Sequence, residues 1–239
     1  MDIRSGQRLA WENKKAKGFD TTDCETTFIV IDFEATTPSG ARPEPIDVAA
    51  MWLTAADGTP RPAGHRFQAL IKPPAHAPVT DMDTRQTAIT AEMVARQPSA
   101  HDVLAKLDEA LTDGPYLLVA HNAPTEAGIL NDYREHCPRL ATTYFLDTVR
   151  LARTAYPDLP SHSLGVVLRH LRIPIPAGRH RAMPDVELTA AAFPQILADG
   201  AAAGRWHRLA DLRRIGGYQP KASRPRQESL FDISPAELR

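Results

Sequence analysis

Acidic residues that could hold a metal ion stand at four places where a strand or helix is expected to end or begin: Asp32, Glu34, Glu126 and Asp185. Asp32 and Glu34 follow an apolar run, residues 28–31, that is long enough for one buried strand. Because side chains alternate across a strand, the two carboxylates share a face. Two carboxylates at this spacing repel each other. A divalent cation bound between them, with their oxygens as its ligands, would relieve this repulsion. An acidic strand end facing solvent has the same pattern.

The other two acids fall in the first turns of expected helices. Glu126 follows Pro124 and Asp185 follows Pro184, and proline suits the first turn of a helix. Acids are common there because they complement the helix dipole, so each alone has an ordinary structural explanation. The same holds for His180, since one histidine before a helix is usually a surface or hydrogen-bonded residue. The signal for chemistry is the ordered combination of all five.

Alternating strands and helices are expected to position these residues. Three strands joined by turns, over residues 28–31, 46–53 and 67–71, favour an antiparallel meander. An amphipathic helix beginning at Ser99 precedes a fourth strand over residues 116–120, which indicates a crossover onto a mixed sheet. The remaining expected elements are a short helix at 90–95, a helix at 124–137, a strand at 144–146, and helices at 148–156, 161–171, from 184 to a kink or end at Pro194, and around 206–215.

Composition favours a cytoplasmic globular protein. The chain has 239 residues and a formal net charge of -1, so any nucleic-acid site must be local. Two cysteines without metal-ligand spacing indicate reduced thiols, and neither a membrane-spanning apolar run nor a signal region is present. We expect a polar leader over 1–25, one domain over 26–200, and a short helix with a disordered polar tail over 201–239.

Three short blocks occur in order along the chain. Residues 30–37 read VIDFEATT, residues 121–126 read HNAPTE, and residues 180–185 read HRAMPD. Their order and separation resemble the DEDDh family of 3′–5′ exonucleases, which includes proofreading subunits of bacterial replicative polymerases and ribonuclease T. The resemblance covers about residues 26–198. It implies an α/β, ribonuclease H-like fold, in which helices flank a mixed central sheet made of an antiparallel meander plus parallel strands.

The same resemblance implies a phosphodiesterase that uses two ions, Mg²⁺ or Mn²⁺. Asp32 would bridge both ions, while Glu34 and Asp185 would hold the ion that activates water. Glu126 would serve the second ion. His180 would be the general base, because an imidazole pKa of about 6.5 suits proton transfer near neutrality. The product would be a nucleoside monophosphate released from a 3′ end.

Substrate contacts are expected beside these residues. By family position, Phe33 and Ala35 approach the terminal nucleotide. His121 and Asn122 would line the same mouth, although Asn122 serves equally well as a helix cap. Arg181 follows the expected base and could meet a phosphate.

The second block departs from the family pattern at two positions. The family usually has Asp where this chain has Glu126, and an aromatic residue where it has Thr125. The preferred reading is a DNA 3′–5′ exonuclease in repair or proofreading. An exoribonuclease that trims RNA ends is the first alternative. The departures favour a second alternative, a catalytically weakened adaptor for nucleic acid or a sliding clamp.

The tail contains a further short motif. Residues 226–232 read RQESLFD and resemble the bacterial clamp-binding peptide Gln-x-x-Leu-Phe. In this reading Leu230 and Phe231 enter a pocket on the replication sliding clamp while Gln227 fixes the register. An incidental apolar pair that docks back on the domain is the alternative. The motif leans toward DNA as the substrate.

Overall fold

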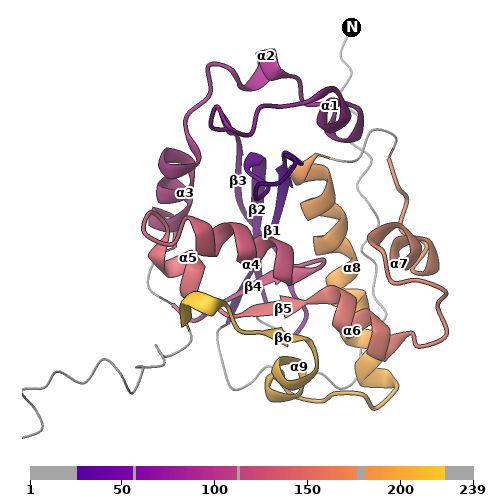
Figure 1. The fold of residues 1–239 in the computed structure, drawn as a ribbon. Coiled ribbons are helices and arrows are strands. Elements are labelled where there is room, and N and C mark those ends of the chain that lie inside the picture. The colour runs from indigo at the N-terminus through magenta and orange to yellow at the C-terminus, as the bar shows by residue number, and fades with distance from the viewer. Residues whose placement is uncertain (1–25, 56–57, 112–113, 177–180, 224–239) are drawn as a thin grey trace, which may run out of the picture.

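A computed structural model describes residues 26–55, 58–111, 114–176 and 181–223. A six-stranded sheet in the order β3-β2-β1-β4-β5-β6 forms its centre (Figure 1). Strands β1 (Thr27–Ala35), β2 (Pro45–Thr54) and β3 (Arg61–Leu70) pair antiparallel, which confirms the expected meander.

The other half of the sheet contains the parallel strands. Strand β4 (Tyr116–Ala120) lies parallel to β1, and β5 (Phe145–Asp147) lies parallel to β4. A two-residue strand, β6 (Gly217–Tyr218), closes the edge antiparallel to β5 and was not expected from the sequence. The sheet is therefore mixed, as a ribonuclease H-like fold requires.

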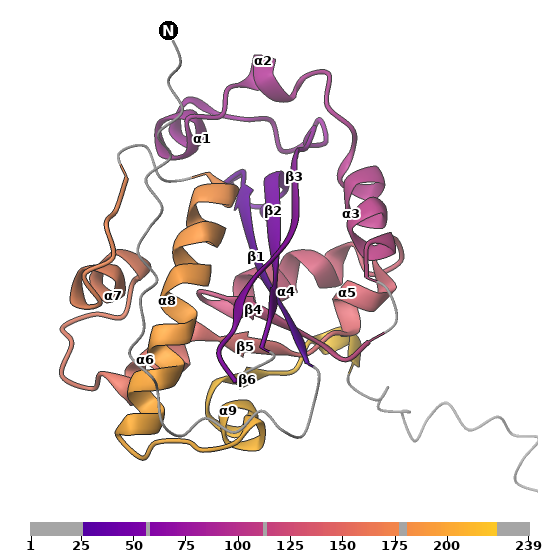
Figure 2. The same cartoon turned by 180° about the vertical axis from the view of Figure 1, so that it is seen from behind.

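Helices cover both faces of this sheet (Figure 2). One face packs against α3 (Ala100–Glu109), α4 (Ala123–Asp132) and α5 (Pro138–Thr142). The opposite face packs against α6 (Thr148–Ala155), α7 (Leu164–His170), α8 (Ala182–Ala202) and α9 (Leu209–Gly216). The short helices α1 (Asp81–Thr87) and α2 (Ala91–Val94) follow β3, and a 3-10 turn, η1, spans Lys221–Ser223.

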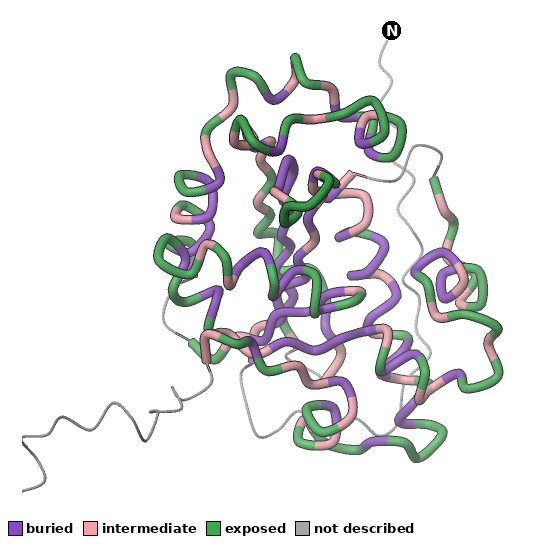
Figure 3. The backbone as a smooth tube through the Cα atoms, viewed as in Figure 1, coloured by how far each residue is buried: buried purple, intermediate pink, exposed green. Residues whose placement is uncertain are grey.

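Strand β1 is buried between the two helical layers, as the tube coloured by burial shows (Figure 3). Phe28 and Val30 belong to the core under α8, whereas Ile29 and Ile31 belong to the core under α3 and α4. The strand is apolar at successive positions because both of its faces are covered. The next residues along it, Asp32 and Glu34, continue the Phe28 face and end the apolar core.

Helix α8 decides one of the two outcomes that the sequence allowed at Pro194, a kink or an end. Pro194 lies inside it and does not end it, since the helix continues to Ala202. Phe193, Ile196 and Leu197 around the proline are buried, and this packing offsets the backbone hydrogen bond that proline cannot donate. Among the described residues, no helix is long and apolar enough to cross a membrane.

Candidate active site

Three carboxylates predicted from the sequence meet at the end of β1. One oxygen from each of Asp32, Glu34 and Asp185 lies within 4.8 Å of the others. Pairing between β1 and β4 stops at Val30, and the acids lie just beyond this point. Helix α8 begins at Ala182, so Asp185 falls in its first turn and reaches the strand end from the helical layer that covers the Phe28 face.

Glu126 reaches the same region from the first turn of α4. The residue is only 4% exposed, and its Oε2 atom has no hydrogen-bond partner among the described residues. Burial raises the pKa of Glu126 to about 8, and the nearby Asp147 and Glu34 carboxylates add to this rise. An unpartnered buried carboxylate oxygen is what a metal ion or its bound water would satisfy.

The field of the clustered acids favours a cation. Burial raises the pKa of Asp32, and repulsion from Glu126, Glu34 and Asp185 raises it further. The pKa of Glu34 rises to about 7, chiefly through burial and then through Asp185 and Asp47. All donors are carboxylate oxygens, the ligand type that hard divalent cations prefer. The residues present therefore fit a divalent metal ion.

Asp47 is a further acid of this region that the sequence analysis missed. It lies on β2 directly opposite Glu34 and is fully buried. Its Oδ2 atom accepts hydrogen bonds from Arg181 Nε at 2.9 Å and from the Ala182 amide at 3.4 Å. A lone acid inside the apolar run of residues 46–53 was the signal that could have revealed it. Asp47 thus ties the start of α8 to the central sheet.

Two further residues that the sequence predicted for the site are the expected base, His180, and the expected phosphate contact, Arg181. His180 lies outside the described residues, so its role remains a prediction. Arg181 is described, and its side chain is about one-quarter exposed while it pairs with Asp47. Its guanidinium charge also opposes the rise in the pKa of Glu34.

His121 and Asn122 lie between β4 and α4, where the sequence placed them. The His121 ring contacts Thr148 Oγ1 at 2.9 Å through Nδ1 and donates from Nε2 to the His162 carbonyl at 3.0 Å. Asn122 is the N-cap residue of α4 in a left-handed conformation, with φ of 93°. Its amide donates to Thr125 Oγ1 at 2.8 Å. Both side chains therefore support the turn that presents Glu126.

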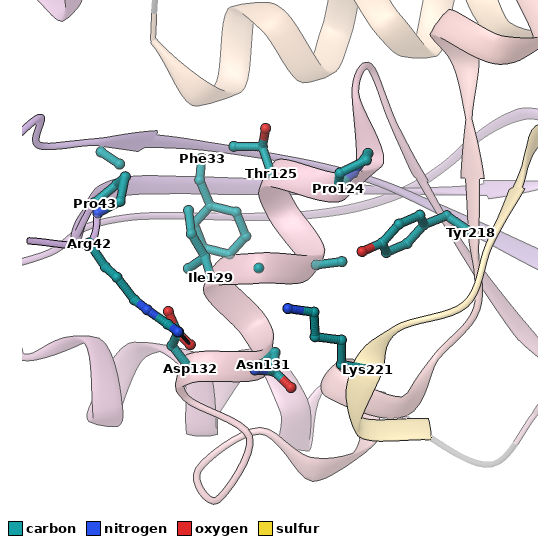
Figure 4. Close-up of a pocket in the computed structure, with 13 residues that line it drawn as sticks. Phe33, Arg42, Pro43, Pro124, Thr125, Ile129, Asn131, Asp132, Tyr218 and Lys221 are labelled. Atoms are coloured by element: carbon teal, nitrogen blue, oxygen red, sulfur yellow. Dashed lines mark hydrogen bonds and ion pairs between the residues drawn. The ribbon is translucent and has the colours of Figure 1, made fainter. Parts of the chain in front are cut away.

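Phe33 and Ala35 line a pocket on the α4 side of β1 (Figure 4). The same pocket is bordered by Thr125 and, unexpectedly, by Tyr218 and Lys221 from the C-terminal part of the chain. Alternation along β1 places Phe33 on the face opposite the acidic cluster.

A ribonuclease H-like sheet with clustered carboxylates at a strand end defines the chain as a nuclease of the metal-dependent, carboxylate-cluster class. Residues 29–193 match the exonuclease family model RNase_T, and the chain belongs to this family. It carries a 3′–5′ exonuclease domain of the DEDDh type, as the ordered acidic blocks indicated.

Sequence similarity to two DNA polymerase III proteins supports this assignment. DNA polymerase III subunit epsilon of Aquifex aeolicus is 30% identical over 174 residues, which are 72% of this chain and 81% of that protein. DNA polymerase III PolC-type of Bacillus cereus is 27% identical over 217 residues. This alignment covers 90% of the chain but only 14% of the polymerase's length.

Solved structures share the fold. The nuclease domain of 3'hExo, a DEDDh family member bound to rAMP, has a TM-score of 0.61 at 21% identity, over 75% of this chain and 95% of that one. Exonuclease X in complex with 5' overhanging duplex DNA has a TM-score of 0.57 at 23% identity, over 80% and 99%.

Proposed function

We propose that this domain removes nucleoside monophosphates from DNA 3′ ends with two Mg²⁺ or Mn²⁺ ions. The observation that supports this most directly is the convergence of Asp32, Glu34 and Asp185 within 4.8 Å. Bound there, the ions would neutralise charge on the attacking and leaving oxygens of the phosphodiester. The family of the chain and its polymerase III relatives favour DNA, in proofreading or repair.

Each residue of the site would have one role in this reaction. Asp32, Glu34 and Asp185 would hold the ions, and Glu126 would complete the oxygen ligands from α4. His180 would accept the proton of the attacking water. The Asp47–Arg181 pair would keep the start of α8, and with it Asp185, against the sheet.

Nuclease assays on 5′-labelled single-stranded DNA and RNA test this proposal. We expect wild type to shorten DNA from its 3′ end with Mg²⁺ or Mn²⁺, and Asp32→Asn to abolish both turnover and metal-dependent thermal stabilisation. His180→Ala should keep the stabilisation and lower turnover about 10²–10⁴-fold. Asp158→Asn, at an exposed position, is the matched control. If the enzyme shortened RNA but not DNA, the substrate would be RNA. If neither substrate were shortened in the presence of Mg²⁺ or Mn²⁺, the catalytic proposal would be refuted.

The tail supports a second element of the proposal, recruitment to a bacterial sliding clamp. Gln227, Leu230 and Phe231 carry the motif and lie outside the described residues. We expect calorimetric titration of the full chain with clamp to give a binding signal that Leu230→Ala/Phe231→Ala removes. Leu238→Ala in the same tail should bind like wild type. Equal binding by all three chains would exclude this motif as the contact.

A further inference from the structure

Two helices at one end of the molecule carry an excess of positive charge. Residues 148–155 and 205–216, which include α6 and α9, hold one acid, Asp211, in a chain whose formal net charge is -1. The same residues hold six arginines, all of them exposed: Arg150, Arg153, Arg205, Arg208, Arg213 and Arg214. We call these six arginines the α6–α9 surface. The chemistry proposed above does not use it.

The arginines of the two helices lie together because the helices approach closely. Helix α9 packs against α6, and the two lie at the same end of the molecule in both views (Figures 1 and 2). A Cβ atom added at Gly216 would lie 2.6 Å from Leu151 Cγ, so this approach requires glycine. Arg150 joins α6 to β6, since its Nη1 atom donates to the Gly217 carbonyl at 2.8 Å. The α6–α9 surface is therefore arranged around one junction of the fold.

The charge of this surface is not balanced within the described ranges. Arg153, Arg213 and Arg214 lie in the last turns of their helices, where a cation complements the helix dipole, so each alone has an ordinary explanation. However, no hydrogen bond or ion pair joins the side chain of Arg153 or Arg213 to another described residue, and Arg214 has only Asp211, at 3.8 Å. A local excess of one sign of charge attracts a polyanion.

The α6–α9 surface begins next to the acidic cluster. Asp147 is the N-cap residue of α6, and its carboxylate is near enough to Glu126 to help raise the pKa of that group. Arg150 follows in the first turn of the helix, with its Nε atom 3.7 Å from Asp147 Oδ2. The helix then leads away from the acids over eight residues, or about 12 Å. A nucleic-acid strand with its 3′ end at the acids could therefore continue along this surface.

We propose that the α6–α9 surface binds the phosphate backbone of the substrate several nucleotides away from the 3′ end. This inference rests on the proposed exonuclease function and concerns a part of the substrate that does not react. A phosphodiester strand fits better than an acidic peptide, because the surface adjoins the acids at which a phosphodiester would be cleaved. Guanidinium groups also pair well with phosphate oxygens, through two parallel hydrogen bonds.

Much of this surface is specific to the C-terminal part of the chain. Four of its six arginines, from Arg205 to Arg214, lie beyond residues 29–193, which match the family model. The C-terminal segment would therefore add a substrate contact that the matched domain lacks.

Two substrates of different length separate this contact from the chemistry in the full chain. A thymidine dinucleotide ends beside the scissile phosphate, whereas a 20-mer oligothymidylate extends well beyond it. Arg153→Gln/Arg213→Gln removes two charges from the surface, and Lys106→Gln/Arg134→Gln removes two exposed charges on α3 and after α4 as the control. We expect the ratio of kcat/KM for the 20-mer to that for the dinucleotide to be about fivefold to 25-fold lower in the first variant than in the control, at 0.1 M salt. An equal ratio in the two variants would overturn the inference.

Binding measured in chelator tests the inference without hydrolysis. A wild type that hydrolyses neither substrate would refute the proposed function alone. Anisotropy of a labelled 20-mer should still show weaker binding by Arg153→Gln/Arg213→Gln than by the control. The slope of log Kd against log salt should fall by about 1.4, as expected for two lost phosphate contacts on a single strand. Unchanged affinity and slope would overturn the inference. A loss of affinity for polyglutamate without a loss for the 20-mer would also overturn it, because the partner would then be an acidic protein.

Discussion

Glu126 stands where the exonuclease pattern usually has Asp, and its environment bears on how the longer side chain fits. It lies in the first turn of α4, on a turn supported by His121 and Asn122, and its carboxylate is buried beside Asp32. The side chain is one methylene longer than aspartate. A helix terminus can accommodate that change more easily than the interior of a strand.

Replacement of Glu126 should separate stability from activity. With a folded pKa of about 8, the carboxyl must gain a proton or lie charged in the core at neutral pH, and both cost free energy when metal is absent. We therefore expect Glu126→Gln to raise Tm in chelator at pH 8 and to lower kcat about 10²–10³-fold. Calorimetry and the nuclease assay measure the two effects.

Glu126→Asp should retain most of the activity, since it keeps the charge and restores the usual family residue. Glu109→Gln, at an exposed position at the end of α3, is the control and should change neither quantity. A Glu126→Gln variant with wild-type turnover would show that this carboxylate takes no part in catalysis.

At the scale of elements, a partly buried ion pair between Asp47 and Arg181 joins strand β2 to the start of the helix that carries Asp185. Arg181→Met would leave Asp47 buried without its countercharge, which costs about 3 kcal/mol. We expect a lower free energy of unfolding and a kcat reduced about 10–100-fold, with KM changed little, because the start of α8 loses its fixed position. Denaturant titration and steady-state kinetics measure these effects.

A second ion pair on the same helix provides the comparison. Arg66 on β3 pairs with Glu187 on α8, and the two side chains are 52% and 47% exposed. Arg66→Ala should cost no more than about 1 kcal/mol and leave kcat unchanged, since exposed pairs contribute little. If Arg66→Ala and Arg181→Met lowered kcat equally, the Asp47 contact would have no special positioning role.

The sequence predicted those parts of the site that follow from local periodicity and motif order. The shared face of Asp32 and Glu34 follows from strand alternation, and their meeting with Asp185 was predicted by the ordered blocks. The lone acid in the run of residues 46–53 marks Asp47 as unusual, but its partner, Arg181, lies 134 residues away and could not be identified from local periodicity. The same limit applies to β6 and to the continuation of α8 past Pro194, which depend on tertiary packing.

At the scale of the whole molecule, the clustered acids should make stability depend on pH and metal together. The pKa of Glu34 rises from 4.5 to about 7 and that of Glu126 from 4.5 to about 8. Because the folded state binds these protons more tightly than the unfolded state, their contribution is full below about pH 4.5 and is lost as pH rises through 7 to 8. We expect Tm in chelator to fall over this window.

Mg²⁺ should reduce this fall, because a bound cation stabilises the charged carboxylates and its binding releases protons. Thermal unfolding between pH 5 and 9, with chelator and with Mg²⁺, measures both effects. Glu34→Gln should flatten the chelator curve, and Asp158→Asn should reproduce the wild-type curve. A Tm that rises from pH 5 to 8 in chelator would contradict the assigned direction of these pKa shifts.

The packing of Trp206 against α8 determines where this domain can be truncated for expression. The indole is 1% exposed, donates to the Leu197 carbonyl at 2.9 Å, and occupies space that Gly200 leaves free: a Cβ there would lie 1.9 Å from the ring. A gene fragment that stopped where the family match stops, at residue 193, would cut through α8 and uncover the apolar surface beneath this indole. Cloning boundaries placed after residue 223 would preserve it.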